Sequence, residues 1–154
     1  MNAPLRPEQQ ALIEAVIVPE TWFFRYPESF STLVNLALKR KAALCGSRPL
    51  RVLSLPCSSG EEPYSIAITV AETFGSNASH VSIMASDLDT NVLATAQKGV
   101  YPIERVDKLS PERLRKFFLR GTGAQEGYVS VRPELKNMIQ FQRINLLDQS
   151  YAVK

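Results

Sequence analysis

A run of small and acidic residues, Cys57-Ser-Ser-Gly-Glu-Glu62, stands between a short apolar segment and a helical pattern. Nucleotide-binding α/β proteins carry a glycine-rich turn at this place, but Gly60 is the run's one glycine, so the G-x-G-x-x-G pattern is absent. The pyrophosphate of a dinucleotide would lie at the start of the following helix, where Glu61 and Glu62 would repel it. S-adenosylmethionine carries a sulfonium and an ammonium group and no phosphate, so the same carboxylates would attract it. The charge pattern therefore favours S-adenosylmethionine over a dinucleotide.

The two glutamates also have a structural explanation, because a carboxylate in the first turn of a helix stabilises that helix by about 0.3 to 1 kcal/mol whatever the function. The spacing alone leaves both explanations open. Asp87 follows a second apolar segment, at a place where an acidic residue commonly accepts hydrogen bonds from ribose hydroxyls. Asp87 could instead cap the next helix, although Asp89 or Thr90 could also do so.

Residue types that bind metals or act as nucleophiles are sparse. The chain has one histidine, His80, and two cysteines, Cys45 and Cys57, which lack partner ligands at metal-binding spacing. We therefore expect no metal site and no Ser-His-Asp arrangement. Two cysteines cannot form a disulfide framework, and the N-terminus lacks the pattern of a secretory signal, so we expect a cytoplasmic protein.

The elements that must position these residues alternate between strand and helix. Short apolar runs predict strands over residues 50–55, 80–86 and 138–144. Apolar residues at helical spacing predict helices over residues 61–74 and 90–98, each followed by a glycine. A strand, turn, helix, strand, acidic residue and helix in this order form a βαβ unit of the doubly wound kind. We therefore predict an α/β fold with a Rossmann-like sheet, of which this chain supplies the N-terminal half.

Further segments flank and interrupt this unit. Helices are predicted over residues 7–17 and 27–43, with an aromatic cluster at residues 21–26 between them. Residues 101–127 do not continue the alternation of strands and helices, so we predict an insertion with one helix there. Residues 128–131 are predicted to form a short strand.

The composition is that of a globular domain, with 154 residues, 45% hydrophobic and 21% charged. We assign residues 1–46 to N-terminal helices and the ligand-facing aromatic segment, and residues 47–154 to the first part of the Rossmann-like domain. No apolar run reaches the roughly 20 residues of a membrane-spanning helix, so we expect no membrane insertion. The net charge of +3 comes from scattered cations without a basic stripe, so we expect no nucleic-acid partner. The oligomeric state stays open.

Five blocks of the sequence form a recognisable series: Thr21-Trp-Phe-Phe-Arg25, Cys57-Ser-Ser-Gly-Glu-Glu-Pro-Tyr-Ser-Ile-Ala67, Ala85-Ser-Asp-Leu-Asp89, Gly99-Val-Tyr101 and Asn145-Leu-Leu147. Together they resemble the chemotaxis receptor methyltransferases, the CheR family, nearly from end to end. The resemblance implies a class I methyltransferase fold and S-adenosylmethionine as cofactor. It also implies O-methylation of glutamate side chains on methyl-accepting receptor proteins, in chemotaxis or a related sensory pathway.

By position, the resemblance implies cofactor-binding roles for several residues. Glu61 is similar to the family's cofactor-binding glutamate, and Glu62 is the second choice. Asp87 matches the aspartate that binds the ribose. Asn145 and Leu146 match the segment that holds the adenine.

The aromatic block carries the residues nearest to the chemistry. By resemblance, Thr21 and Arg25 face the methyl-donor end of the cofactor and the incoming glutamate, with Arg25 as the catalytic residue. Its guanidinium would present a planar fork to the substrate carboxylate. Trp22, Phe23 and Phe24 are predicted to pack and to anchor the backbone, leaving that guanidinium free.

The sequence also departs from the family. Pro19 stands where the family usually has Asn, two residues before the threonine of the aromatic block. The chain ends at Lys154, before the later strands of the family's domain, so we expect a truncated half-domain whose strand over residues 50–55 is an open apolar edge. The alternative to an active methyltransferase is therefore a catalytically silent fragment that only binds the cofactor or the receptor.

Overall fold

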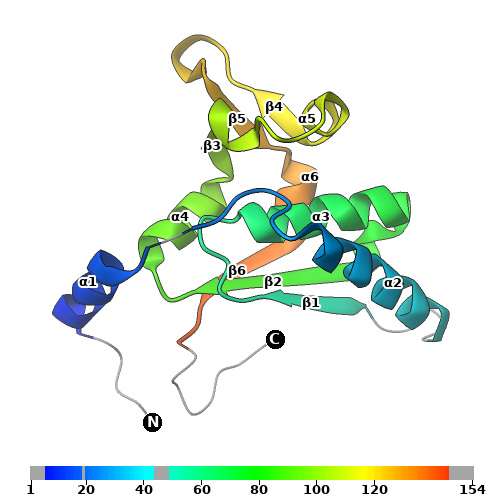
Figure 1. Cartoon of the computed structure of the whole chain (residues 1–154), viewed down its shortest axis with the longest axis horizontal. Helices are drawn as coiled ribbons and strands as arrows, with labels where there is room; N and C mark the ends of the chain where they lie inside the picture. Colours follow the sequence, from blue (N-terminus) through cyan, green and yellow to red (C-terminus); the bar gives the residue numbers. More distant parts are fainter. Residues whose placement is uncertain (1–5, 19, 44–48, 146–154) are drawn as a thin grey trace.

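A parallel sheet of three strands forms the centre of the molecule (Figure 1), for which a computed structural model describes residues 6–18, 20–43 and 49–145. The strands are β1 (Leu50–Ser54), β2 (Val81–Asp87) and β6 (Ile139–Arg143), in the order β1-β2-β6. All pairs are parallel, with Val52 opposite Ile83 in one ladder. The order confirms the predicted half of a Rossmann-like sheet.

Two helices connect these strands on one side of the sheet. Helix α3 (Glu61–Phe74) follows β1 and lies over the sheet (Figure 1), and α4 (Thr90–Lys98) follows β2. The hydroxyl of Tyr64 in α3 donates to the carbonyl of Ala96 in α4 at 2.8 Å, so the helices are neighbours. Asp89 caps α4, because its carboxylate accepts from the amides of Asn91 and Val92. Asp87 therefore does not serve as that cap.

Alternation along the strands separates the core face of the sheet from its other face. Ile83 and Ala85 of β2 are fully buried beneath the helices. On the other face, Arg51 and Gln140 are exposed, and Leu53 keeps 47% of its surface. One face of the sheet thus carries the apolar core, and the other is covered less completely within the described residues.

The predicted insertion is a small antiparallel sheet that projects from the rest of the molecule (Figure 1); we call residues 100–131 the arm. Its strands are β3 (Val100–Pro102), β4 (Phe118–Arg120) and β5 (Tyr128–Val131), in the order β3-β5-β4. Between β3 and β4 lie η2 (Ile103–Val106) and α5 (Pro111–Phe117), and η3 (Gly123–Gln125) follows β4. The arm returns to β6 through α6 (Pro133–Lys136).

The N-terminal helices lie on opposite sides of the aromatic block. Helix α2 (Pro27–Ala43) packs against α3, whereas α1 (Pro7–Val16) has no buried side chain. Polar contacts hold α1 instead: Gln10 donates to the carbonyl of Leu88 at 3.0 Å, and Glu14 accepts from the amide of Thr90 at 3.0 Å. The boundary that we predicted near residue 46 lies outside the described residues. Among the described residues, no helix combines the length and hydropathy needed to cross a membrane.

Candidate functional site

A cleft of about 690 Å³ opens where all three parallel strands end. Residues at or just after the ends of β1, β2 and β6 form one wall, including Ser58, Asp87 and Asn145. The segment that connects α1 to α2 supplies much of the other wall, through Ile17, Val18, Glu20, Thr21, Trp22, Arg25 and Tyr26. In open α/β sheets, ligands bind outside the carboxyl ends of the strands, so this cleft is the candidate site.

Asp87 fixes the turn that follows β1. Its Oδ2 accepts from the amide of Ser58 at 2.7 Å, and its Oδ1 accepts from the amide of Asp89 at 3.1 Å. Ser58 adopts a left-handed backbone with φ of 48°, which an L-residue adopts only at some cost. Each carboxylate oxygen has a second lone pair, and Asp87 lines the cleft, so it can still accept from ligand hydroxyls.

The two adjacent glutamates point to different places. Glu62 lines the cleft and accepts from the hydroxyl of Ser54 at 2.7 Å. Glu61 is not among the cleft-lining residues: its carboxylate is fully buried and accepts from Ser59 Oγ at 2.6 Å and from Arg105 of the arm. Successive helix residues differ by about 100° in direction, and here Glu62 faces the cleft while Glu61 faces the arm. The geometry thus favours Glu62, the second choice from the sequence, as the glutamate that meets a ligand.

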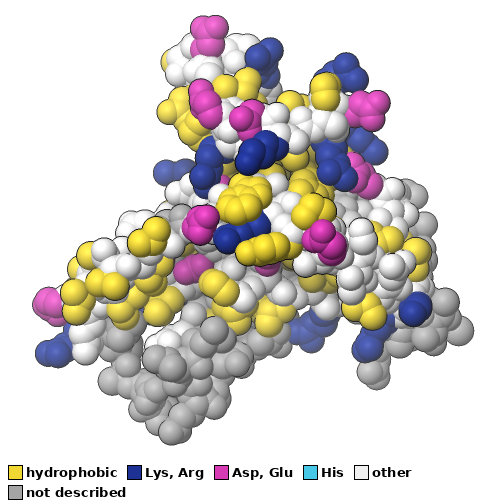
Figure 2. All heavy atoms as spheres, in the orientation of Figure 1, with side chains coloured by type: hydrophobic (Ala, Val, Ile, Leu, Met, Phe, Trp, Pro, Cys, Tyr) yellow, Lys and Arg dark blue, Asp and Glu magenta, His cyan; other side chains and the backbone are white. Residues whose placement is uncertain are grey.

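Arg25 stands in the cleft wall between two aromatic rings. Its guanidinium carbon lies 4.4 Å from the ring centroid of Trp22 and 5.0 Å from that of Tyr26. Its Nη1 donates to the carbonyl of Glu20 at 2.5 Å. The sequence predicted a free guanidinium beside anchoring aromatics; in the structure Trp22 instead holds the guanidinium and is itself 38% exposed. Figure 2 shows hydrophobic, basic and acidic side chains side by side on the face that this segment crosses.

The remaining aromatics anchor the segment, as predicted. Phe23 is 4% exposed and packs edge-on against Tyr101 and Phe118 of the arm, with ring centroids at 5.2 and 5.6 Å. The amide of Phe24 donates to Ser65 Oγ in α3 at 2.9 Å. In the same segment Phe24 and Tyr26 have left-handed backbone conformations, with φ of 56° and 60°. Each such residue costs roughly 1 to 2 kcal/mol, so the segment's shape depends on its packing.

The structure brings four predicted site residues together at the cleft: Thr21, Arg25, Asp87 and Asn145. Leu146 and Pro19 lie outside the described residues.

The sequence reasoning assigned no role in the site to Cys57, which also lines the cleft. Burial, aided by the negative charge of Asp87, raises the pKa of the Cys57 thiol to about 12.

The charge of the cleft suits a cationic ligand without phosphate. Among its lining residues are the carboxylates of Glu20, Glu62 and Asp87, against the one guanidinium of Arg25. Apolar side chains such as Val92 complete the walls. Carboxylates of this kind attract a sulfonium and an ammonium group and repel a pyrophosphate, so the residues present fit S-adenosylmethionine. Within the part of the chain that the structure describes, no group of three or more His, Cys, Asp or Glu residues could hold a metal ion.

Comparison with known proteins shows which family and which relatives the chain is similar to. The family model described as "CheR methyltransferase, SAM binding domain" matches residues 19–154. The chain is 44% identical over 146 residues to chemotaxis protein methyltransferase 2 of Pseudomonas aeruginosa, covering 95% of this chain and 51% of that relative. It is 42% identical over 146 residues to the chemotaxis protein methyltransferase of Salmonella typhimurium, covering 95% and 49%. It is 46% identical over 143 residues to the probable biofilm formation methyltransferase WspC of Pseudomonas aeruginosa, covering 92% and 32%.

The matches show the family of the chain and how much of its relatives' length the chain spans. The chain spans about half the length of the two chemotaxis relatives. The matched family model is that of an S-adenosylmethionine-binding domain, which identifies the cofactor. Because the match covers residues 19–154, the chain belongs to the CheR methyltransferase family.

Proposed function

We propose that the protein transfers a methyl group from S-adenosylmethionine to glutamate side chains of methyl-accepting receptor proteins. One observation carries this proposal: an arginine held between two aromatic rings stands in the wall of a cleft rich in carboxylates. The carboxylates suit the cationic cofactor, and the arginine suits an anionic substrate group. A cleft that combines both can bring a cation and a carboxylate together.

The reaction requires positioning more than proton transfer. A glutamate side chain has an ordinary pKa of about 4.3, so it is already an anionic nucleophile at neutral pH and needs no general base. When bound, S-adenosylmethionine supplies an activated methyl group on a sulfonium. Alignment of reacting groups can lower a barrier by several kcal/mol. We therefore assign catalysis to the residues that align the carboxylate.

Arg25 is the residue that we propose for this alignment. Trp22 and Tyr26 restrict the plane of its guanidinium, the carbonyl of Glu20 accepts from Nη1, and the Glu20 carboxylate lies 3.7 Å from Nη2. The guanidinium has five N–H donors, so further donors remain for a substrate carboxylate. Restricting the fork before the substrate arrives reduces the conformational entropy lost on binding. Thr21 lines the same part of the cleft, and we place it near the methyl-donor end of the cofactor.

The opposite wall would hold the rest of the cofactor. We propose that Asp87 accepts hydrogen bonds from the ribose hydroxyls and that Glu62 faces the amino group. Asn145 lies in the cleft where β6 ends, and we assign it to the adenine. Leu146 follows Asn145 in the sequence, and its assignment to the adenine rests on the family resemblance.

The names of the relatives support a receptor as partner. Two are chemotaxis protein methyltransferases and one is a probable biofilm formation methyltransferase. We propose that the substrate is a sensory receptor in one of these kinds of pathway, methylated on its cytoplasmic side.

The test combines binding with the chemistry of the product. Calorimetry on the full-length protein should detect binding of S-adenosylhomocysteine and should detect no binding of NAD. Incubation with radiolabelled S-adenosylmethionine and receptor-containing membranes should then label the receptor. Because a glutamate methyl ester hydrolyses in base, alkali should release the label as volatile methanol. Label that resists alkali would show methylation of another group and would contradict the glutamate assignment.

A further inference from the structure

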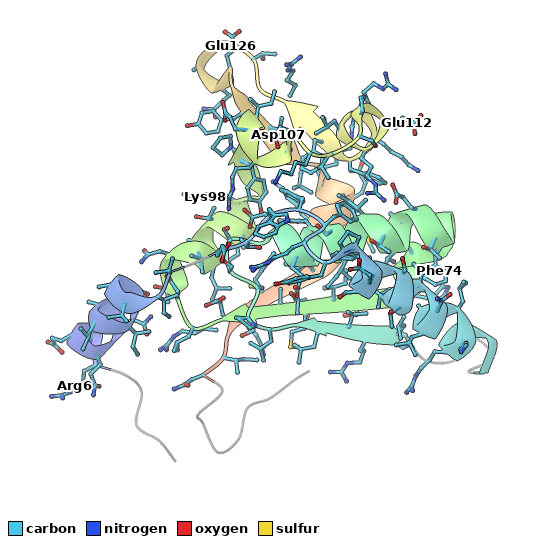
Figure 3. The ribbon with its side chains drawn as sticks, viewed as in Figure 1. Arg6, Phe74, Lys98, Asp107, Glu112 and Glu126 are labelled. Carbon is cyan, nitrogen blue, oxygen red and sulfur yellow. The ribbon has the colours of Figure 1, made fainter. Side chains whose placement is uncertain are left out.

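The base of the arm contacts the turn that follows β1, which we call the cofactor turn (residues 55–60). The hydroxyl of Tyr101 in β3 donates to the carbonyl of Ser59 at 2.7 Å. Arg105 in η2 donates to the carboxylate of Glu61, and its Nη2 lies 3.5 Å from Ser59 Oγ. Figure 3 shows side chains filling the space between α3 and the part of the arm where Asp107 is labelled.

The contact is tight at the turn itself. Gly60 has φ of +98°, and a Cβ at this position would lie 2.8 Å from the hydroxyl oxygen of Tyr101 and 2.9 Å from Cβ of Ala96. A side chain at position 60 would therefore push the arm away from the turn. Tyr101 is 2% exposed and also packs on Phe23 of the aromatic segment. The same tyrosine thus contacts both the cofactor turn and the aromatic segment.

The pair between Glu61 and Arg105 is asymmetric in burial. The Glu61 side chain is fully buried, whereas Arg105 keeps 44% of its side-chain surface. A buried carboxylate that loses its cationic partner is strongly disfavoured, because it has lost both water and its counter-charge. Glu61 would then move toward solvent or toward the cleft and would take Ser59 with it. Ser58, whose amide is bonded to Asp87, directly precedes Ser59.

From these contacts we infer that Arg105 is a positioning residue of the arm, which neutralises the buried Glu61 carboxylate and thereby fixes the cofactor turn. This inference rests on the proposed function only in taking the cleft as the cofactor site. In this arrangement Glu61 connects the arm to the cofactor turn and does not contact the cofactor directly. The arm is therefore part of the cofactor site, although its strands lie outside the cleft.

The test is a set of charge variants in the full-length protein, titrated with S-adenosylhomocysteine well below the lowest melting temperature. Arg105→Ala should weaken binding roughly tenfold, the scale of a coupling of about 1.4 kcal/mol. Glu61→Gln alone should change it little, because the amide can keep the bond to Ser59. The double variant should recover affinity to within about threefold of the wild type, because no buried charge is left unpaired. Arg105→Lys should be intermediate.

A matched control and the opposite results make the test decisive. Arg120→Ala removes the same charge from an exposed position on the arm and should leave the affinity unchanged. If wild type binds no S-adenosylhomocysteine, the proposed function fails. If wild type binds and Arg105→Ala binds equally well, this inference fails. It also fails if Glu61→Gln loses as much affinity as Arg105→Ala and the double variant does not recover, because Glu61 would then be a ligand. Should Arg105→Ala not fold, the double variant and Arg105→Lys decide the question.

Discussion

The guanidinium carbon of Arg25 lies 4.4 Å from the ring centroid of Trp22, and both residues line the same cleft. A cation over an aromatic face at a partly exposed site is worth about 0.5 to 1 kcal/mol. Tyr26 adds a second ring at 5.0 Å. The two contacts together restrict the orientation of the planar fork.

Replacing Arg25 should separate catalysis from cofactor binding. Arg25→Ala should lower the initial rate of methyl transfer at least about tenfold, because the substrate carboxylate loses its bidentate partner, while affinity for S-adenosylhomocysteine falls much less. Arg25→Lys should restore the rate only in part, because an ammonium lacks the planar fork. Rates with radiolabelled cofactor and calorimetric titrations measure the two effects. Equal losses of rate and affinity in both variants would make Arg25 a cofactor ligand instead.

Asp87 and Asp89 offer a matched pair of acidic residues two positions apart. Asp87→Ala should weaken S-adenosylhomocysteine binding by about 1 to 3 kcal/mol, because ribose hydroxyls lose a charged acceptor. Asp89→Ala removes the cap of α4 and should cost about 1 kcal/mol of folding stability with little change in affinity. Calorimetry and thermal unfolding distinguish the two roles. Unchanged affinity in Asp87→Ala would remove that residue from the site.

Elements with a long periodic pattern could be predicted from the sequence. The bounds predicted for α3 and α4 are those of the structure, because each helix has a full apolar stripe and ends at a glycine. The parallel order β1-β2-β6 followed from the alternation of strands and helices. Strands β3 and β4 were not predicted, since three residues are too few to show an alternation.

The directions of the side chains within the site could not be predicted from the sequence. Glu61 and Glu62 are adjacent and chemically identical, and only the start of α3 and the position of the arm decide which one is buried against Arg105. The orientation of Arg25 depends on the left-handed backbone at Phe24 and Tyr26. Neither residue type favours that conformation, so it could not be predicted from the sequence. The contact between Glu14 and Thr90 could not be predicted either, because the two residues lie 76 positions apart in the sequence.

The edge of the parallel sheet should make the 154-residue chain self-associate. In the described residues β1 is paired on one side only, by β2, and Leu53 on it is 47% exposed. Open apolar edge strands are templates for pairing between molecules. Sedimentation velocity should show a mass that rises with concentration, and Leu53→Lys should lower the association. A chain that stays monomeric over the whole accessible concentration range would contradict this expectation.

Cys57 should be inert in the folded protein. Its thiol is 1% exposed, and burial together with the charge of Asp87 raises its pKa to about 12, so little thiolate exists at neutral pH. In a Cys45→Ser background Cys57 is the chain's single cysteine. Alkylation by iodoacetamide at pH 8 should then be slow in buffer and fast in denaturant. Rapid alkylation in buffer would show that the cofactor turn opens frequently.

Glu14 should make the docking of α1 sensitive to acid. Hydrogen bonds from Thr90 and Gln10 lower the pKa of the Glu14 carboxyl from 4.5 to about 2. The pKa is lower in the folded state than in the unfolded state, so Glu14 stabilises the folded form above about pH 4.5. That contribution is lost as the pH falls from 4.5 toward 2. Glu14→Gln should therefore lower the melting temperature at pH 7, and the difference from wild type should shrink toward zero near pH 2.

Glu14→Gln should also weaken ligand binding in the cleft. Ile17 and Val18 line the cleft and directly follow α1. Since α1 has no buried side chain, loss of the Glu14 contacts should increase hydrogen exchange along the helix and weaken S-adenosylhomocysteine binding at pH 7. Glu8→Gln removes an equal charge from an exposed position on α1 and is the control. If Glu14→Gln and Glu8→Gln have equal effects on exchange and affinity, then total charge and not the contact with Thr90 holds α1 beside the cleft.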